Sequence, residues 1–156
     1  MQTPSLVCET TGVVTSPNDA LVRGLIVAAP FAALVGVEVD VIEVDRVRLR
    51  LPFRPEVTTI ADLVHGGAIA SLIDVAATAA AWSGAEAARS SRGTTIGFTV
   101  SFLAAGRGQD LAATAEVIQR GRTICVIEVA VAGADGAAVA RALVTYKLGE
   151  TAAAGG

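Results

Sequence analysis

Residues 66–83 form a long apolar stretch that carries one ionisable side chain, Asp74. Burying a carboxylate costs free energy unless it is paired or neutralised, and aspartate is a poor residue for a helix interior. A residue that breaks two rules at once is typical of a functional site. The alternative interpretation is structural: the Asp74 carboxylate hydrogen-bonds a backbone group or pairs with an arginine from a strand. Position alone leaves both interpretations open.

The motif His65-Gly66-Gly67 stands directly before this stretch. Two glycines allow a ligand or another backbone to come close, and the first turn of a helix presents free N–H groups with a partial positive charge. Together these features can stabilise a carbonyl oxygen that gains negative charge, as an oxyanion hole does. The alternative is an ordinary glycine turn into a helix.

The spacing of the two features suggests how they work together. Gly66 and Asp74 are eight residues apart, roughly 12 Å along a helix, whereas reacting groups must approach within about 3.5 Å. Two such helices packed antiparallel bring Asp74 of one beside Gly66 of the other, so we expect a symmetric dimer with two shared sites. Thr78, one turn beyond Asp74, either holds a water or the carboxylate or donates back to the Asp74 carbonyl.

Hydrophobic periodicity predicts the elements that position these residues. Residues 66–83 are Ala-rich and free of proline, which predicts a helix buried on most faces. Asp74 at the centre of this segment argues against a membrane span. A curved antiparallel sheet wrapped around this one apolar helix, an α+β architecture, is the economical fold. Four strands are expected after the helix, over Thr94–Leu103, Leu111–Arg120, Thr123–Val131 and Ala138–Leu148.

Two further elements are expected before the long helix. Asn18 or Asp19 is placed to cap a short helix over Ala20–Ala29, which Pro30 would end. Two-fold alternation from Val35 onward then predicts an antiparallel hairpin whose break lies near Glu43–Asp45. The domain organisation follows: a loose lead-in over 1–17, one domain over 18–148 and a flexible tail over 149–156.

Composition excludes several classes of function. Hydrophobic residues make up 53% of the chain and charged residues 17%, which excludes a disordered protein. A net charge of −3 argues against nucleic acid as a partner. Cys8, Cys125 and the single histidine do not provide metal-ligand spacing, so no metal site is expected. The first residues lack the pattern of a secretory signal, so a cytoplasmic protein without a membrane partner is expected.

The run His65-Gly66-Gly67-Ala68-Ile69-Ala70-Ser71-Leu72-Ile73-Asp74 resembles the signature of the hotdog-fold acyl-CoA thioesterases of the PaaI (phenylacetic acid degradation) type. The likeness extends from about Val35 to Leu148 and includes the Gly121-Arg122 turn. The resemblance implies a hotdog fold, with a long central helix wrapped by about six antiparallel strands. It also implies homodimers, and commonly homotetramers built as dimers of dimers.

The resemblance also implies roles for individual residues. An acid at the Asp74 position is the nucleophile or the general base for water, and the Gly66 N–H binds the thioester carbonyl across the dimer interface. His65 helps to fix the loop or the thioester end. A hydroxyl at the Thr95 position assists near the carboxylate, and a threonine such as Thr78 orients water.

Substrate binding involves a second set of expected residues. Gly67 belongs to the glycine motif, and Thr59 stands where many relatives carry Asn or Gln. Relatives often have an Arg-Pro pair where this chain has Ala104-Ala105, and Arg107 is placed to supply that charge. Because coenzyme A carries phosphates, basic residues should rim the site. The candidates are Arg89, Arg92, Arg107, Arg120 and Arg122.

The sequence therefore predicts hydrolysis of a small aryl- or medium-chain acyl-CoA to free acid and coenzyme A. Coenzyme A is part of the substrate, and no separate cofactor is expected. Trp82, Phe98 and Phe102 are candidates for lining an aryl or medium-chain pocket. The alternative is a non-catalytic acyl-CoA sensor on the same fold, against which the acid at position 74 argues. A hydratase ranks last, because the single histidine lies at the expected oxyanion loop.

Overall fold

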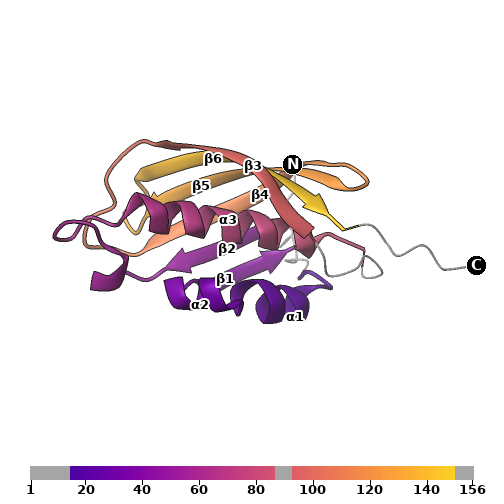
Figure 1. Ribbon diagram of the computed structural model, residues 1–156, viewed down its shortest axis with the longest axis horizontal. Coiled ribbons are helices and arrows are strands. Elements are labelled where there is room, and N and C mark those ends of the chain that lie inside the picture. Colours follow the sequence, from indigo (N-terminus) through magenta and orange to yellow (C-terminus); the bar gives the residue numbers. More distant parts are fainter. Residues whose placement is uncertain (1–14, 87–92, 150–156) are drawn as a thin grey trace, which may run out of the picture.

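The fold is an antiparallel sheet with one long helix packed along it (Figure 1). The computed structural model describes residues 15–86 and 93–149. The sheet has the strand order β1-β2-β4-β5-β6-β3, and every neighbouring pair is antiparallel. The strands are β1 Glu38–Glu43, β2 Arg46–Leu51, β3 Gly93–Phe102, β4 Leu111–Arg120, β5 Ile124–Gly133 and β6 Ala138–Leu148. The expected hotdog fold is confirmed.

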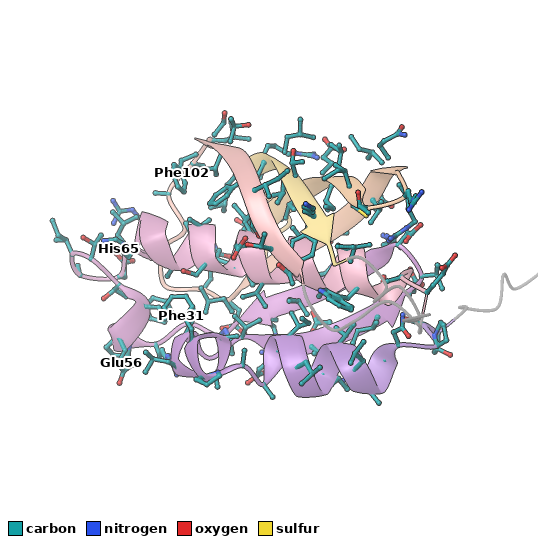
Figure 2. All side chains as sticks on the ribbon, turned by 45° about the vertical axis from the view of Figure 1, so that its right-hand side comes forward. Phe31, Glu56, His65 and Phe102 are labelled. Atoms are coloured by element: carbon teal, nitrogen blue, oxygen red, sulfur yellow. The ribbon has the colours of Figure 1, made fainter. Side chains whose placement is uncertain are left out.

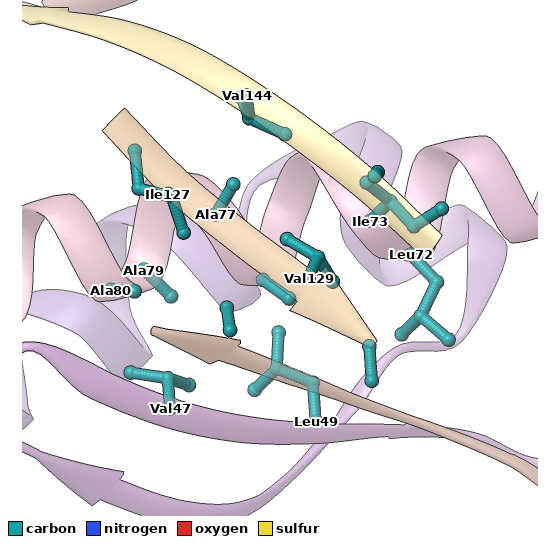
Figure 3. Close-up of a cluster of buried hydrophobic side chains, with 14 of the residues drawn as sticks. Val47, Leu49, Leu72, Ile73, Ala77, Ala79, Ala80, Ile127, Val129 and Val144 are labelled. Atoms are coloured by element: carbon teal, nitrogen blue, oxygen red, sulfur yellow. The ribbon is translucent and has the colours of Figure 1, made fainter. Parts of the chain in front are cut away.

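The central helix α3, Gly66–Ser83, has the predicted bounds and forms the core with the sheet. Leu72, Ile73 and a series of alanines on this helix are fully buried. They face strand residues such as Leu49 and Val129 (Figure 3). Small alanine side chains allow the helix backbone to approach the sheet closely. By length and composition α3 would pass for a membrane span, but 61% of it is buried inside the fold, as expected for a core helix.

Residues far away in the sequence donate hydrogen bonds to the backbone carbonyl groups at the C-terminal end of α3. The Asn18 side chain donates to the carbonyls of Trp82 (2.9 Å) and Ala85 (2.8 Å). The Ser16 hydroxyl donates to the Ser83 carbonyl (2.6 Å). The last carbonyls of a helix have no partner within the helix, and here side chains more than sixty residues away provide one.

Most predicted strand bounds are confirmed to within two residues. β4 and β6 have the predicted bounds, and β3 and β5 begin or end one or two residues away from them. The hairpin β1–β2 turns at the predicted place, where Asp45 adopts a positive φ of 63°. The backbone N–H of Asp45 also donates a hydrogen bond there to the Ser83 hydroxyl oxygen (2.9 Å).

The prediction for the N-terminal region is wrong in two respects. Instead of one helix over Ala20–Ala29, the structure has α1, Asp19–Leu21, followed by the π-helical segment η1, Val22–Val27. Pro30 begins a further helix, α2, Pro30–Val35. Proline is favoured at the first position of a helix because that N–H has no partner anyway. A single proline therefore separates two helical segments rather than ending helical structure.

The end of the predicted lead-in also belongs to the fold. Thr15 bridges to Glu43 beside β1, and Ser16 is buried. The remaining lead-in, residues 1–14, and the tail from residue 150 lie outside the described residues. A short 3-10 turn, η2 Pro55–Val57, begins the connection between β2 and α3.

Candidate active site

Asp74 and Thr95 form a direct hydrogen bond between the central helix and the edge strand β3. The Thr95 hydroxyl donates to Asp74 Oδ1 over 2.6 Å, and both side chains are partly buried. The register of β3 shifts between Thr95 and Gly97, which marks a bulge. Bulges next to active sites re-aim side chains. The structure thus pairs Asp74 with a hydroxyl, and within residues 15–86 and 93–149 no arginine forms an ion pair with it.

A second hydrogen bond, between Trp82 and Tyr146, lies next to the Asp74–Thr95 pair. Tyr146 on β6 is directly opposite Thr95 in the strand ladder. Its hydroxyl accepts from the indole N–H of Trp82 over 3.0 Å. Burial raises the pKa of the Tyr146 phenol, and the negative charge of Asp74 adds to this shift. Tyr146 therefore remains a neutral hydroxyl at neutral pH.

The first turn of α3 leaves one N–H group available. The Gly67 N–H donates to His65 Nδ1 (2.8 Å), and the N–H groups of Ala68 and Ile69 donate to the His65 carbonyl. The Gly66 N–H donates to no other described residue. The cap thus leaves Gly66 as the unused donor at a helix end where a developing negative charge is stabilised.

His65 is the N-cap of α3, and the hydrogen bond that its side chain accepts from the Gly67 N–H also holds the imidazole ring in place. Because Nδ1 accepts a hydrogen bond, the neutral imidazole carries its proton on Nε2. The loop is anchored on both sides, since the His65 N–H donates to the Val57 carbonyl and the Val64 N–H to the Gly106 carbonyl. Figure 2 shows His65 at the beginning of α3, below Phe102 of β3. A Cβ on Gly66 would lie 3.5 Å from the Phe102 ring.

Two open hollows meet along this part of α3. One, of about 560 Å³, is lined by Asp74 and Thr95 together with Ile96 and Phe98 of β3. The other, of about 590 Å³, extends past His65 and Gly67. Phe31 and Ser71 line both hollows, so they are neighbours on one surface. Figure 2 shows Phe31 between α2 and α3.

The predicted separation of the two reactive features holds on the observed helix. Gly66 and Asp74 both belong to the uninterrupted α3, so they are roughly 12 Å apart along its axis. Thr78 is partly exposed, and its hydroxyl forms no hydrogen bond within the described part of the chain. The alternative of back-bonding from Thr78 to the Asp74 carbonyl is therefore not realised.

The basic candidates are spread over the molecule. Arg107 pairs with Asp62 (3.1 Å) beside the loop that leads into α3. Arg120 is used structurally, because it binds Asp45 and donates to the Ala81 carbonyl (3.0 Å). Arg122 is exposed at the β4–β5 turn. Arg89 and Arg92 lie outside the described residues, and Thr59 is exposed on the loop before α3.

Sequence reasoning missed Phe31, because it expected helical structure to end at Pro30. It considered Phe102 for the acyl pocket but not as a cover for Gly66. Tyr146 was also missed, since its strand position marks it only as a core residue. In the described part of the chain, no three His, Cys, Asp or Glu side chains are grouped so that they could hold a metal ion.

Comparison with known families decides the broader identity. A family model described as the thioesterase superfamily matches residues 61–140, just over half of the chain, including α3 and β3. The chain belongs to the thioesterase superfamily. A candidate esterase from Halobacterium salinarum is 32% identical over 124 residues, covering 78% of this chain and 82% of that protein.

Solved structures of the superfamily share the fold. A thioesterase family protein from Silicibacter pomeroyi has a TM-score of 0.76 and 29% identity, covering 83% of this chain and 96% of that one. The PaaI protein of Escherichia coli has a TM-score of 0.73 and 21% identity, covering 83% and 91%. The resemblance is thus confirmed for the superfamily, in which the PaaI type is one structural neighbour among many.

The N-cap role of His65 yields a first prediction. His65→Ala should lower the free energy of unfolding by about 1 kcal/mol, because the Gly67 N–H loses its acceptor. His65→Asn should restore most of this loss, since asparagine is a favoured N-cap. Urea unfolding at neutral pH measures both. Equal stability of His65→Ala and the natural protein would contradict the cap role.

Proposed function

We propose that the protein is an acyl-CoA thioesterase in which Asp74 and the Gly66 N–H act on the thioester. The single observation that carries this proposal is the geometry of α3. The Asp74 carboxylate, oriented by Thr95, lines one hollow, and the unused N–H of Gly66 lies between His65 and Gly67, which line the adjoining hollow. A carboxylate supplies the nucleophile or base, and the N–H stabilises the oxyanion.

Either of two routes fits this arrangement. As a general base, Asp74 takes a proton from a water whose oxygen attacks the thioester carbon. As a nucleophile, it forms a mixed anhydride that water then hydrolyses. In both routes the C–S bond breaks and the coenzyme A thiolate leaves, after the carbonyl oxygen has gained charge at the Gly66 N–H. Thr78, with its free hydroxyl one turn further along, is suited to hold the water.

The site requires a second copy of the chain. Because Gly66 and Asp74 are too far apart within one helix, Asp74 of one copy must meet Gly66 of another. β3 is an edge strand with exposed apolar residues, including Ile96 (54% exposed) and Phe102 (53%). A long apolar edge strand is a template for pairing with another strand. We propose that two copies pair along β3, with their α3 helices antiparallel.

This dimer would also gather basic residues around the coenzyme A moiety. Arg107 lies near the beginning of α3 and Arg122 beyond its end, so antiparallel helices bring Arg107 of one copy toward Arg122 of the other. A hypothetical thioesterase of Streptococcus pneumoniae with this fold (TM-score 0.66, 21% identity, covering 76% of this chain and 89% of that one) was solved with coenzyme A. It supports an acyl-CoA as the substrate class.

Asp74→Asn tests the catalytic carboxylate. The variant should fold normally, since the amide oxygen can still accept from Thr95, but it should release almost no thiol from acyl-CoAs. Asp40→Asn on the exposed face of β1 serves as the matched control and should keep full activity. Thiol release from a panel of aryl and aliphatic acyl-CoAs measures this. Unchanged turnover in Asp74→Asn would exclude the mechanism, and binding without turnover in the natural protein would indicate a sensor.

Gly66→Pro removes the proposed oxyanion donor with little disturbance of the helix. Proline is favoured at the first helical position, and His65 before it has φ −65° and ψ 134°, which a following proline accepts. The variant should lose 10²- to 10³-fold in kcat, as for one oxyanion donor. Gly66→Ala keeps the N–H and is the control. Similar activity of the two variants would contradict the role of the N–H.

The shared site predicts complementation between inactive variants. Co-expression of Asp74→Asn and Gly66→Pro should restore about a quarter of the natural activity, because half of the dimers are mixed and each carries one intact site. Each variant alone should remain inactive. Purification through two different affinity tags isolates the mixed dimer for the thiol assay. An inactive mixed dimer would show that each chain uses its own residues.

A further inference from the structure

A third hollow lies near the C-terminal half of α3 and has no lining residue in common with the two hollows of the site. It has a volume of about 290 Å³. Leu25 and Ile26 of the π-helical segment η1 form one wall, and Trp82 and Tyr146 form another. Leu21 and Gly93 complete the lining, so among residues 15–86 and 93–149 no charged side chain lines the hollow.

Gly93 leaves room for the Tyr146 ring beside this hollow. A Cβ at this position would lie 2.6 Å from the Tyr146 hydroxyl oxygen, which is closer than real contacts allow. The Tyr146 ring is itself held by the hydrogen bond from Trp82 (3.0 Å). Any larger residue at the first position of β3 would therefore displace the Tyr146 ring.

Neighbouring residues on β3, β6 and α3 place this hollow near the proposed catalytic carboxylate of Asp74. Tyr146, which lines it, is directly opposite Thr95 in the β3–β6 ladder, and Thr95 donates to Asp74. On the helix, the partly exposed Thr78 lies between Asp74 and Trp82 at intervals of four residues. Residues four apart are neighbours on a helix surface. The β3–β6 pair and helix α3 therefore each place a residue that lines the hollow, Tyr146 or Trp82, close to the surroundings of Asp74.

The chemistry of the hollows indicates which end of the substrate each one binds. The hollow beside Gly67 is lined by Arg54, Glu56 and His65, which suit the polar arm of coenzyme A. The described lining of the hollow at Trp82 is uncharged, and its neutral Tyr146 hydroxyl accepts from Trp82 and donates to no other described residue. An uncharged, mainly apolar group fits the second hollow, and a carboxylate at the end of the acyl group does not.

We propose that the hollow formed by Leu25, Ile26, Trp82, Gly93 and Tyr146 binds the distal end of the acyl group. This inference rests on the proposed thioesterase function. Asp74 and Trp82 are eight residues apart on α3, roughly 12 Å, and bonds of about 1.5 Å advance an extended chain by about 1.3 Å per carbon. An unbranched, uncharged acyl chain of roughly eight to ten carbons therefore matches this separation in length.

Trp82 reports directly on this hollow, because it is the only tryptophan of the chain. The probes are coenzyme A analogues in which a methylene group replaces the thioester sulfur, with acyl chains of two, four, eight and ten carbons. Tryptophan fluorescence of the natural protein should change with the two longer analogues and not with the two shorter ones. Gly93→Ala, which crowds Tyr146, should abolish the change. Fluorescence that responds equally to all four lengths, or to none, would overturn the proposal.

Kinetics with two matched substitutions provide the second test. Leu25→Phe adds volume at the hollow, whereas Ile118→Phe adds the same group at an exposed position of β4. Leu25→Phe should reduce the preference for octanoyl-CoA over butanoyl-CoA, measured as the ratio of kcat/KM, by about tenfold. Ile118→Phe should leave the ratio unchanged. An unchanged ratio in Leu25→Phe would also overturn the proposal.

The two proposals fail in distinguishable ways. Hydrolysis of acyl-CoAs without length dependence and without a fluorescence response would overturn the acyl-end site and leave the thioesterase function intact. Fluorescence that depends on chain length without release of thiol from any acyl-CoA would overturn the thioesterase function. The hollow would then be supported as an acyl-binding site of a non-catalytic protein.

Discussion

The packing of α3 against the sheet is the constraint on which the site depends. The helix must bury enough apolar surface to hold the sheet together, and its alanines and Leu72 do so against strands β2, β4, β5 and β6. It must also leave a stripe uncovered, on which Ser71, Asp74 and Thr78 stay partly exposed. Both demands are met because the side chains on the buried faces are mostly small. A helix with larger residues there would stand further from β3, and the 2.6 Å contact between Asp74 and Thr95 would be lost.

The contrast between the apolar buried faces of α3 and its partly exposed polar stripe explains why the helix could be predicted from the sequence. The absence of proline, the alanine content and the glycine pair define α3 through local preferences, and the isolated Asp74 stands out because everything around it is apolar. The strands that follow are equally clear from their composition and turns. What local patterns cannot show is which residues meet across the sheet. Tyr146 lies opposite Thr95 because β3 pairs with β6 and carries a bulge. Neither the pairing nor the bulge can be predicted from the residues that adjoin these two in the sequence.

The N-terminal region illustrates a different limit. Its helical segments are short, and one of them is π-helical, a form for which intrinsic preferences give no signal. Tertiary contacts with α3 determine their shape instead. Phe31, Leu25 and Ile26 come from these segments and line hollows beside the helix. The part of the chain that is hardest to predict therefore supplies walls of the proposed binding hollows, while the predictable helix carries the proposed reactive groups. Binding surfaces formed by variable connecting segments on a regular scaffold are common in proteins.

The hydrogen bonds at the end of α3 have a consequence for how the chain folds. The carbonyls of Trp82, Ser83 and Ala85 receive their donors from Ser16 and Asn18, and Arg120 supplies the donor for Ala81. Until these distant segments arrive, the last turn of the helix is left with unsatisfied carbonyls. In the first turn, by contrast, the acceptor for the Gly67 N–H is local, because His65 Nδ1 provides it. The helix should thus grow from its glycine end, and its final turn should become ordered late, when contacts of long sequence separation close. During synthesis the Ser16 and Asn18 side chains would have no partner on α3 until the residues up to Ala85 had emerged from the ribosome, and the Ala81 carbonyl would have no side-chain donor until Arg120 followed.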